Sequence, residues 1–98
     1  MELNISLSPG QASFAALLAE RVPYLLPLFD FSERAYLQDE VEKFLAAASH
    51  GEAIMARFFL SIWRHADEFD FDFIDAAATL DKGQMKVITD WLEKPFWP

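Results

Sequence analysis

The pattern of hydrophobic and polar positions divides the chain into short helical segments. Ser8-Pro9 is typical of a helix N-cap followed by proline at the first helical position, where the missing N–H of proline is harmless. From there apolar residues recur at three- and four-residue steps, which predicts a helix over 9–21. We expect its buried face to consist of Phe14, Leu17, Leu18 and Val22.

The second helical pattern follows a segment that contains two prolines. Residues 22–31 are apolar but interrupted, so we expect an apolar turn laid over the core. Ser32 has the side chain of an N-cap, and apolar residues then repeat at helical steps as far as Ala48. The pattern therefore predicts a second helix over 32–48.

The third helical segment is apolar on nearly every side. Ser49 stands three residues before Glu52, which is the spacing of a capping box and predicts a helix over about 50–65. A helix that is apolar all round is a buried one, so we place it at the centre of the domain. Its polar residues form one narrow stripe. The stripe consists of Arg57, Ser61 and Arg64. We expect its two arginines to pair with acids such as Glu52 or Glu68. The alternative is that the arginines form a site for an anionic ligand or a partner.

The C-terminal third changes its periodicity twice. Residues 69–73 alternate Phe and Asp as a strand would, and the next five residues favour a helix. Asp81 and Gln84 form a second capping-type pair before a last helix, which Pro95 stops. The face of that helix expected to be buried comprises Met85, Ile88, Trp91 and Leu92.

These elements predict an all-α fold. We expect one domain over residues 1–98, a bundle of four to five helices around the buried helix at about 50–65. Leu3, Ile5 and Leu7 alternate with polar residues, which predicts a short strand or an extended arm. An isolated strand is not stable, so it would pair with residues 68–73 or with a second copy of the chain.

Composition and charge narrow the function. The chain has 98 residues, 53% of them apolar, with 16 acidic and 8 basic side chains and a net charge of −8. This excess of acid argues against direct binding to nucleic acid or to an anionic membrane. A positively charged leader is absent from the start of the sequence, and no apolar stretch approaches the roughly 20 residues of a membrane span. We therefore expect a cytoplasmic protein.

The candidate chemistry is sparse. The chain lacks cysteine and has two histidines, and no spacing pairs a nucleophile with a base. The acids of 67–75 lack the glycine and glutamate of an EF-hand loop, so we interpret them as helix-capping and solubilising groups. We predict no catalytic, cofactor-binding or metal-binding residues; a small metal-binding or hydrolytic protein is the second alternative.

A surface rich in carboxylates suggests the first alternative function. An acidic inhibitor of phage or mobile-element type could imitate DNA and block a nucleic-acid-binding protein by presenting rows of carboxylates. The candidates for such an acidic surface are Glu40, Glu42, Asp67, Glu68, Asp70, Asp72 and Asp75.

The aromatic content is the strongest functional hint. Ten Phe, three Trp and two Tyr are a large load for a chain whose small size leaves much surface in water. Aromatic residues dominate interface hot spots, so we expect a non-catalytic accessory protein, an adaptor or inhibitor of bacterial or phage type, that binds another protein and forms a homodimer. The interface candidates are Leu3, Ile5, Leu7, Phe69, Phe71, Phe73, Phe96 and Trp97.

Overall fold

The computed structural model describes residues 7–98 and is mostly helical, which confirms the predicted all-α class. The chain forms, in order, α1 (Pro9–Arg21), the 3-10 helix η1 (Pro23–Leu28), β1 (Phe29–Asp30), β2 (Ala35–Tyr36), α2 (Gln38–Ala47), α3 (His50–Arg64), α4 (Phe73–Thr79) and α5 (Lys82–Glu93). The predicted arm residues Leu3 and Ile5 lie outside the described residues. Leu7 precedes α1 without regular secondary structure.

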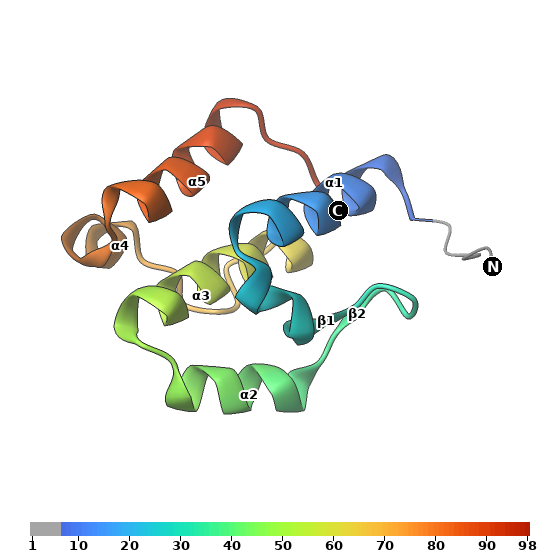
Figure 1. The fold of residues 1–98 in the computed structure, drawn as a ribbon, viewed down its shortest axis with the longest axis horizontal. Helices are drawn as coiled ribbons and strands as arrows, with labels where there is room; N and C mark the ends of the chain where they lie inside the picture. Colours follow the sequence, from blue (N-terminus) through green and yellow to red (C-terminus); the bar gives the residue numbers. More distant parts are fainter. Residues whose placement is uncertain (1–6) are drawn as a thin grey trace.

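Helix α3 lies in the middle of the molecule (Figure 1), with α2 on one side of it and α5 on the other. Figure 1 also shows α4 at one end of the molecule, and the C-terminal tail returning to the beginning of α1. Among residues 7–98, no helix combines the length and apolarity needed to cross a membrane.

Three helices begin with the capping boxes that their sequences encode. In each box the N-cap side chain accepts a hydrogen bond from the third backbone N–H of the helix, and the side chain at that third position accepts one from the N-cap N–H. The pairs are Ser8 with Gln11, Ser49 with Glu52, and Asp81 with Gln84. These caps fix the starts of α1, α3 and α5 at the predicted places.

The prediction of a helix over 32–48 is wrong in its first part. Residues 29–36 form a small antiparallel hairpin, in which Phe29 pairs with Tyr36. The Oδ1 atom of Asp30 accepts hydrogen bonds from the Ser32 hydroxyl at 2.6 Å and from the Ser32 backbone N–H at 3.1 Å. Ser32 is therefore held in the hairpin turn and does not cap a helix. Helix α2 begins only at Gln38.

The strand-like alternation of residues 69–73 does not produce a strand. Asp70 has a φ of 58°, in the left-handed region, which interrupts an extended chain and which Asp tolerates better than most residues. Two residues later the Asp72 carboxylate accepts hydrogen bonds from the backbone N–H groups of Ile74 and Asp75 and starts α4. The segment is consequently a loop, in which Phe69 and Phe71 are partly buried and Asp70 and Asp72 are exposed.

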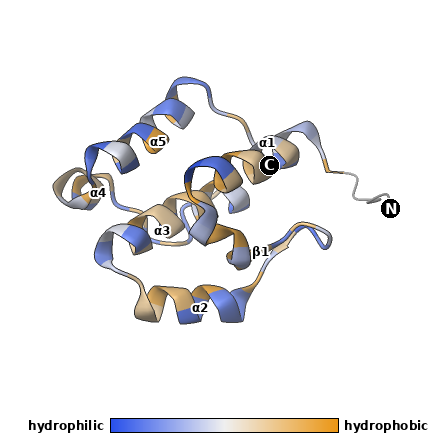
Figure 2. Ribbon diagram, in the orientation of Figure 1, coloured by the Kyte–Doolittle hydropathy of each residue, from blue (hydrophilic) through white to orange (hydrophobic). Residues whose placement is uncertain are grey.

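One hydrophobic core surrounds α3, which confirms that this helix is the buried central element. Its buried residues are Ile54, Met55, Ala56, Phe58, Phe59, Leu60 and Ile62. Figure 2 shows hydrophobic colours along most of α3 and along η1. On α5 the buried face differs from the predicted one: Val87, Ile88 and Trp91 are buried, whereas Leu92 is exposed.

The C-terminal tail packs on the start of α1 at a glycine. A Cβ atom built on Gly10 would overlap the carbonyl group of Trp97, so a side chain at this position would collide with the tail. The tail is also held by a hydrogen bond of 3.1 Å from the Trp91 indole Nε1 to the carbonyl oxygen of Phe96. Gly10 and Trp91 therefore fix where Trp97 lies.

Candidate functional site: an aromatic groove

A groove of about 430 Å³ opens between the end of α3, the connection from α3 to α4, and the C-terminal tail. We call it the aromatic groove. Its apolar wall consists of Phe58, Ile62, Ala66, Phe71, Phe73, Trp91, Leu92 and Trp97. Polar groups contribute little to the lining; they are Ser61, His65 and Asp67.

The aromatic rings of the groove contact one another in a continuous series. Phe58 lies with its ring centroid 5.2 Å from that of Phe71 and 5.7 Å from that of Trp91. Phe71 continues the series to Phe73 at 4.8 Å, and Trp91 continues it to Trp97 at 5.1 Å. Most of these pairs are edge-to-face, the arrangement that aromatic quadrupoles favour. The wall is thus built and held before any ligand arrives.

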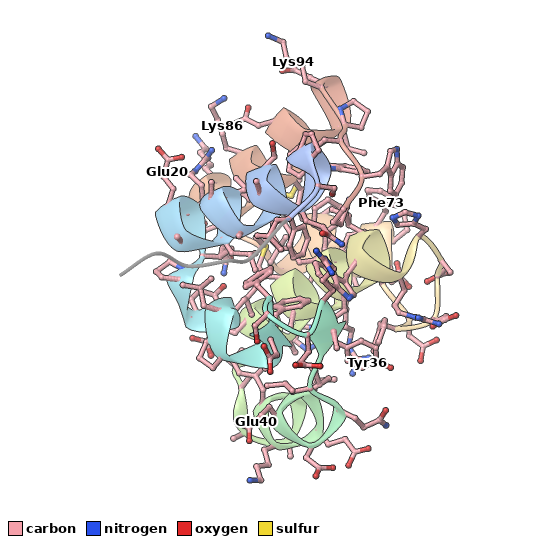
Figure 3. All side chains as sticks on the ribbon, turned by 90° about the vertical axis from the view of Figure 1, so that its right-hand side faces the viewer. Glu20, Tyr36, Glu40, Phe73, Lys86 and Lys94 are labelled. Carbon is pink, nitrogen blue, oxygen red and sulfur yellow. The ribbon has the colours of Figure 1, made fainter. Side chains whose placement is uncertain are left out.

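The groove ends in large apolar side chains that are open to water. Phe73 is 56% exposed, Leu92 is 46% exposed and Trp97 is 54% exposed. Figure 3 shows Phe73 at the periphery of the molecule. Single exposed apolar residues are common on protein surfaces, but a contiguous group around a hollow is typical of an interaction site.

The polar stripe of α3 holds the chain segment that forms one wall. Arg64 Nε donates a 3.0 Å hydrogen bond to the Glu68 carboxylate, as the four-residue spacing predicts. Arg57 does not form the expected ion pair with Glu52 or Glu68 among the described residues; its Nη1 donates to the backbone carbonyl of Phe69 at 2.8 Å. The two arginines therefore fasten the connection between α3 and α4 onto α3.

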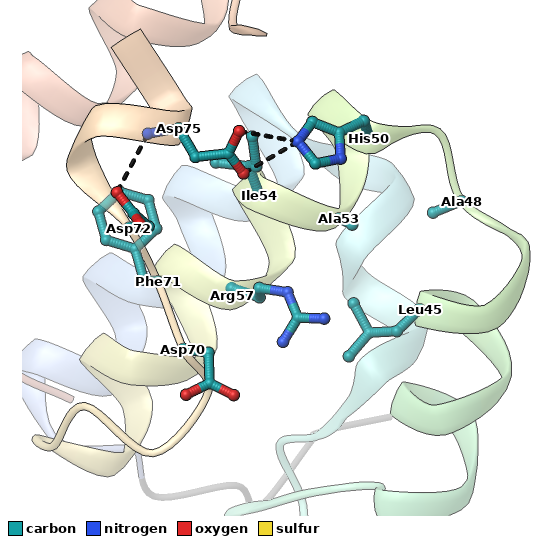
Figure 4. A pocket seen from close by; sticks show the side chains of 10 residues that line it. All are labelled: Leu45, Ala48, His50, Ala53, Ile54, Arg57, Asp70, Phe71, Asp72 and Asp75. Atoms are coloured by element: carbon teal, nitrogen blue, oxygen red, sulfur yellow. Dashed lines mark hydrogen bonds and ion pairs between the residues drawn. The ribbon is translucent and has the colours of Figure 1, made fainter. Parts of the chain in front are cut away.

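A second cavity, the polar pocket, lies on the other side of Phe71, which lines both hollows. The polar pocket has a volume of about 310 Å³ and is shown in Figure 4. The Nε2 atom of His50 lies 2.9 Å from both carboxylate oxygens of Asp75. Hydrogen bonding to His50 lowers the pKa of the Asp75 carboxyl. This pair joins the start of α3 to α4.

The polar pocket holds part of a catalytic arrangement. An imidazole held by a carboxylate can move a proton, and the Arg57 guanidinium in the same pocket can stabilise negative charge. The ten lining residues, however, include no hydroxyl, thiol or amine that His50 could activate as a nucleophile. Within residues 7–98 no three His, Asp or Glu side chains gather closely enough to hold a metal ion.

Among the interface candidates within residues 7–98, the structure brings three together and separates the other three. Phe71, Phe73 and Trp97 line the aromatic groove. Phe69 packs edge-to-face on Tyr36 at 5.5 Å, outside the groove. Phe96, a residue of the tail, packs against the core. Leu7 does not line the groove.

Seven groove residues are absent from the interface and acidic-surface candidates that the sequence offered. They are Phe58, Ser61, Ile62, His65, Ala66, Trp91 and Leu92. The periodicity of α5 gives no signal for Leu92, because this residue stands four positions after the buried Ile88 and so belongs to the same face by spacing, yet it is exposed. His65 ends α3 in a left-handed conformation, with a φ of 57°, and its ring contacts that of Trp97.

The candidate acidic residues occupy three different places. Asp67 lines the aromatic groove, whereas Asp70, Asp72 and Asp75 line the polar pocket. Glu68 is paired with Arg64. On α2, Glu40 lies 3.8 Å from the Lys43 amine, and Glu42 accepts a hydrogen bond from Gln38.

Comparison with models of known protein families, with curated proteins and with solved structures finds no match to this chain. The functional argument therefore depends on the geometry of the aromatic groove and of the polar pocket. These two sites offer different chemistry, apolar contact area in one and charged hydrogen-bonding groups in the other.

Proposed function

We propose that this protein acts by binding another protein through the aromatic groove and catalyses no reaction. The observation that carries the proposal is the exposure of Phe73, Leu92 and Trp97 around one preformed hollow. Large side chains of this kind lose the most contact with water when a partner covers them, and they are the usual energetic centre of an interface.

The rigidity of the groove supports this function. Phe71 and Trp91 pack against Phe58, which is buried on the central helix, so the floor of the groove is continuous with the core. A surface that is ordered before binding avoids part of the entropic cost of ordering side chains at an interface. The groove therefore has the properties of a docking surface.

The polar pocket supports catalysis less well. Its imidazole is held by Asp75, but the side chain of His50 is 65% exposed, and no nucleophile stands beside it in the lining. Reactions of this class need the base and nucleophile to be held together out of bulk water. The His50–Asp75 pair serves instead to join two helices.

The homodimer expected from the sequence stays a prediction. A second copy of the chain could cover Phe73, Leu92 and Trp97 in the same way as a different protein would. Both cases are forms of the proposed function, since each places an apolar surface in the aromatic groove.

The test is a selection for binding peptides followed by a comparison of variants. Peptides from a random display library would be selected on the wild-type protein and their affinities measured by surface plasmon resonance. We expect Phe73→Ala to weaken binding at least about tenfold, the effect of losing one hot-spot residue. The matched control is Leu37→Ala, which truncates a part-exposed apolar residue just before α2. Equal affinities for both variants would contradict the proposal.

A further inference from the structure

Carboxylates border the aromatic groove on the side of the connection between α3 and α4. Asp67 is part of its lining, and Asp70 and Asp72 stand on either side of Phe71 in the sequence. All three are exposed, and none of them forms an ion pair with another residue of the described chain, 7–98. Their charges are therefore available to a partner.

Positive charge is scarce in the same region. No lysine or arginine lines the aromatic groove, and His65 is its one basic side chain. In the neighbouring polar pocket, three aspartates face one arginine and one histidine. His50 is already paired with Asp75, and Arg57 donates to the Phe69 carbonyl oxygen. The border of the groove is thus acidic, in a chain whose net charge is −8.

We infer that the aromatic groove receives a basic segment of a different protein, one with large apolar residues flanked by lysine or arginine. This inference rests on the proposed function and adds the chemistry of the partner. The apolar residues would fill the hollow between Phe73 and Trp97. The flanking cations would face Asp67 in the lining and reach for the exposed Asp70 on the same connection between α3 and α4. Asp70 is exposed and precedes the groove residue Phe71 in the sequence, so it is the nearest polar-pocket carboxylate along the chain to a segment seated in the groove.

A second copy of this chain fits the groove less well. A symmetric contact places the same patch of each subunit against the other, so the carboxylates beside one groove would approach those beside the other. Like charges at an interface oppose association, and the net charge of −8 on each chain adds to the repulsion. A basic partner turns the same carboxylates into favourable contacts.

The experiment uses two defined peptides that share leucine and tryptophan anchors at helical spacing and differ in their flanks, lysine in one and glutamate in the other. Their affinities for the full chain would be measured by fluorescence anisotropy. We expect the lysine peptide to bind at least about tenfold more tightly, since several charge pairs form at once. The joint substitution Asp67→Asn with Asp70→Asn should weaken the lysine peptide about fivefold.

The matched control is the joint substitution Glu40→Gln with Glu42→Gln on α2, which changes the net charge by the same amount away from the groove. We expect it to change the affinity less than about twofold. If it weakens the lysine peptide as much as the groove variant does, the attraction is only to net charge and the inference is overturned. Equal binding of the two peptides would overturn it as well.

The variant Phe73→Ala distinguishes a failure of the proposed function from a failure of the inference about the partner's charge. If it weakens both peptides while their flanks make no difference, the groove binds protein and only the inference about charge fails. If it weakens neither peptide, the proposed function fails too. Light scattering behind a sizing column completes the set: a dimer that Phe73→Ala abolishes would identify a second copy as the occupant, which supports the proposed function and overturns the basic partner.

Discussion

Two aromatic clusters of similar construction meet very different surroundings in this molecule. In the first, the ring of Phe14 lies 5.2 Å from Phe29, 5.9 Å from Phe59 and 5.2 Å from Trp63. In the aromatic groove the neighbouring rings are 4.8 to 5.7 Å apart. Ring contacts at similar distances therefore occur both in a closed core and on an open surface.

The difference lies in what covers the rings. Phe14 comes from α1 and Phe29 from the hairpin, so two elements close over α3 on that side, and both rings are buried. On the groove side, α4 has seven residues and the tail approaches through one hydrogen bond and ring contacts. The contacts of Phe73 with Phe71 and of Trp97 with Trp91 leave both Phe73 and Trp97 exposed. The comparison indicates that the aromatic groove has the ring packing of a core, but that no element of residues 7–98 packs over its exposed side.

The strongest contrast between the clusters is expected from removing one ring from each. Phe14→Ala should lower the free energy of unfolding by about 3–5 kcal/mol, because it leaves a cavity in a fully buried cluster. Phe73→Ala should lower it by less than about 1 kcal/mol, because half of that ring is already in water. Urea unfolding followed by circular dichroism measures both values. Similar losses for the two variants would show that the groove is part of the folded core.

The next effect concerns the arginine that fastens the groove wall. Arg57→Met keeps an apolar stem but removes the charged hydrogen bond to the Phe69 carbonyl, so we expect a loss of about 1.5–3 kcal/mol. Arg64→Met, the control, breaks an exposed ion pair with Glu68 and should cost less than about 1 kcal/mol. The same unfolding measurement tests the pair, and a larger cost at Arg64 would contradict the assignment.

Alanine substitutions at two glycines should change the stability of the protein in opposite directions. Gly10→Ala should destabilise the protein by about 1–2 kcal/mol, because the new methyl group displaces the tail and breaks the hydrogen bond from Trp91 to Phe96. Gly83→Ala on α5 has room, with the nearest atom 3.4 Å away, and should stabilise by about 0.5–1 kcal/mol. Acrylamide quenching should report greater exposure of tryptophan in Gly10→Ala alone.

The sequence predicted the parts of the fold that depend on neighbouring residues. Ser8, Ser49 and Asp81 set helix starts through hydrogen bonds within three residues, and the spacing from Arg64 to Glu68 predicted an ion pair. Ser32 misled the prediction because Asp30 holds it in the hairpin turn by accepting hydrogen bonds from both its hydroxyl and its backbone N–H. A cap and a turn use the same residue types, so local pattern could not decide between them.

The aromatic groove depends on contacts across the chain, which explains why only part of it was predicted. Phe71, Phe73 and Trp97 were candidates because they lie beside turns. Phe71 meets Phe58 through the connection between α3 and α4, whereas Trp97 joins the series through Trp91 only because the tail returns to the start of α1, where Gly10 leaves room for it. Periodicity describes one element at a time and carries no information about such a contact. The pairing of His50 with Asp75, 25 residues apart, escaped the sequence for the same reason.

The smallest expected effect concerns pH and the pair that joins α3 to α4. The hydrogen bond from His50 lowers the pKa of Asp75 from its ordinary value of 3.8, so the charged carboxylate is favoured in the folded state. Its contribution is present above pH 3.8 and is lost as the pH falls through the lowered pKa of the folded protein. Asp75→Asn should therefore show a smaller drop in melting temperature than the wild type between pH 5 and pH 2.5, on the order of one or two degrees. Because the two proteins carry the same other titratable groups, the difference between their curves isolates the pair. Parallel curves would mean that His50 and Asp75 touch without stabilising the fold, and the border between the polar pocket and the aromatic groove would then be held by Arg57 and Arg64.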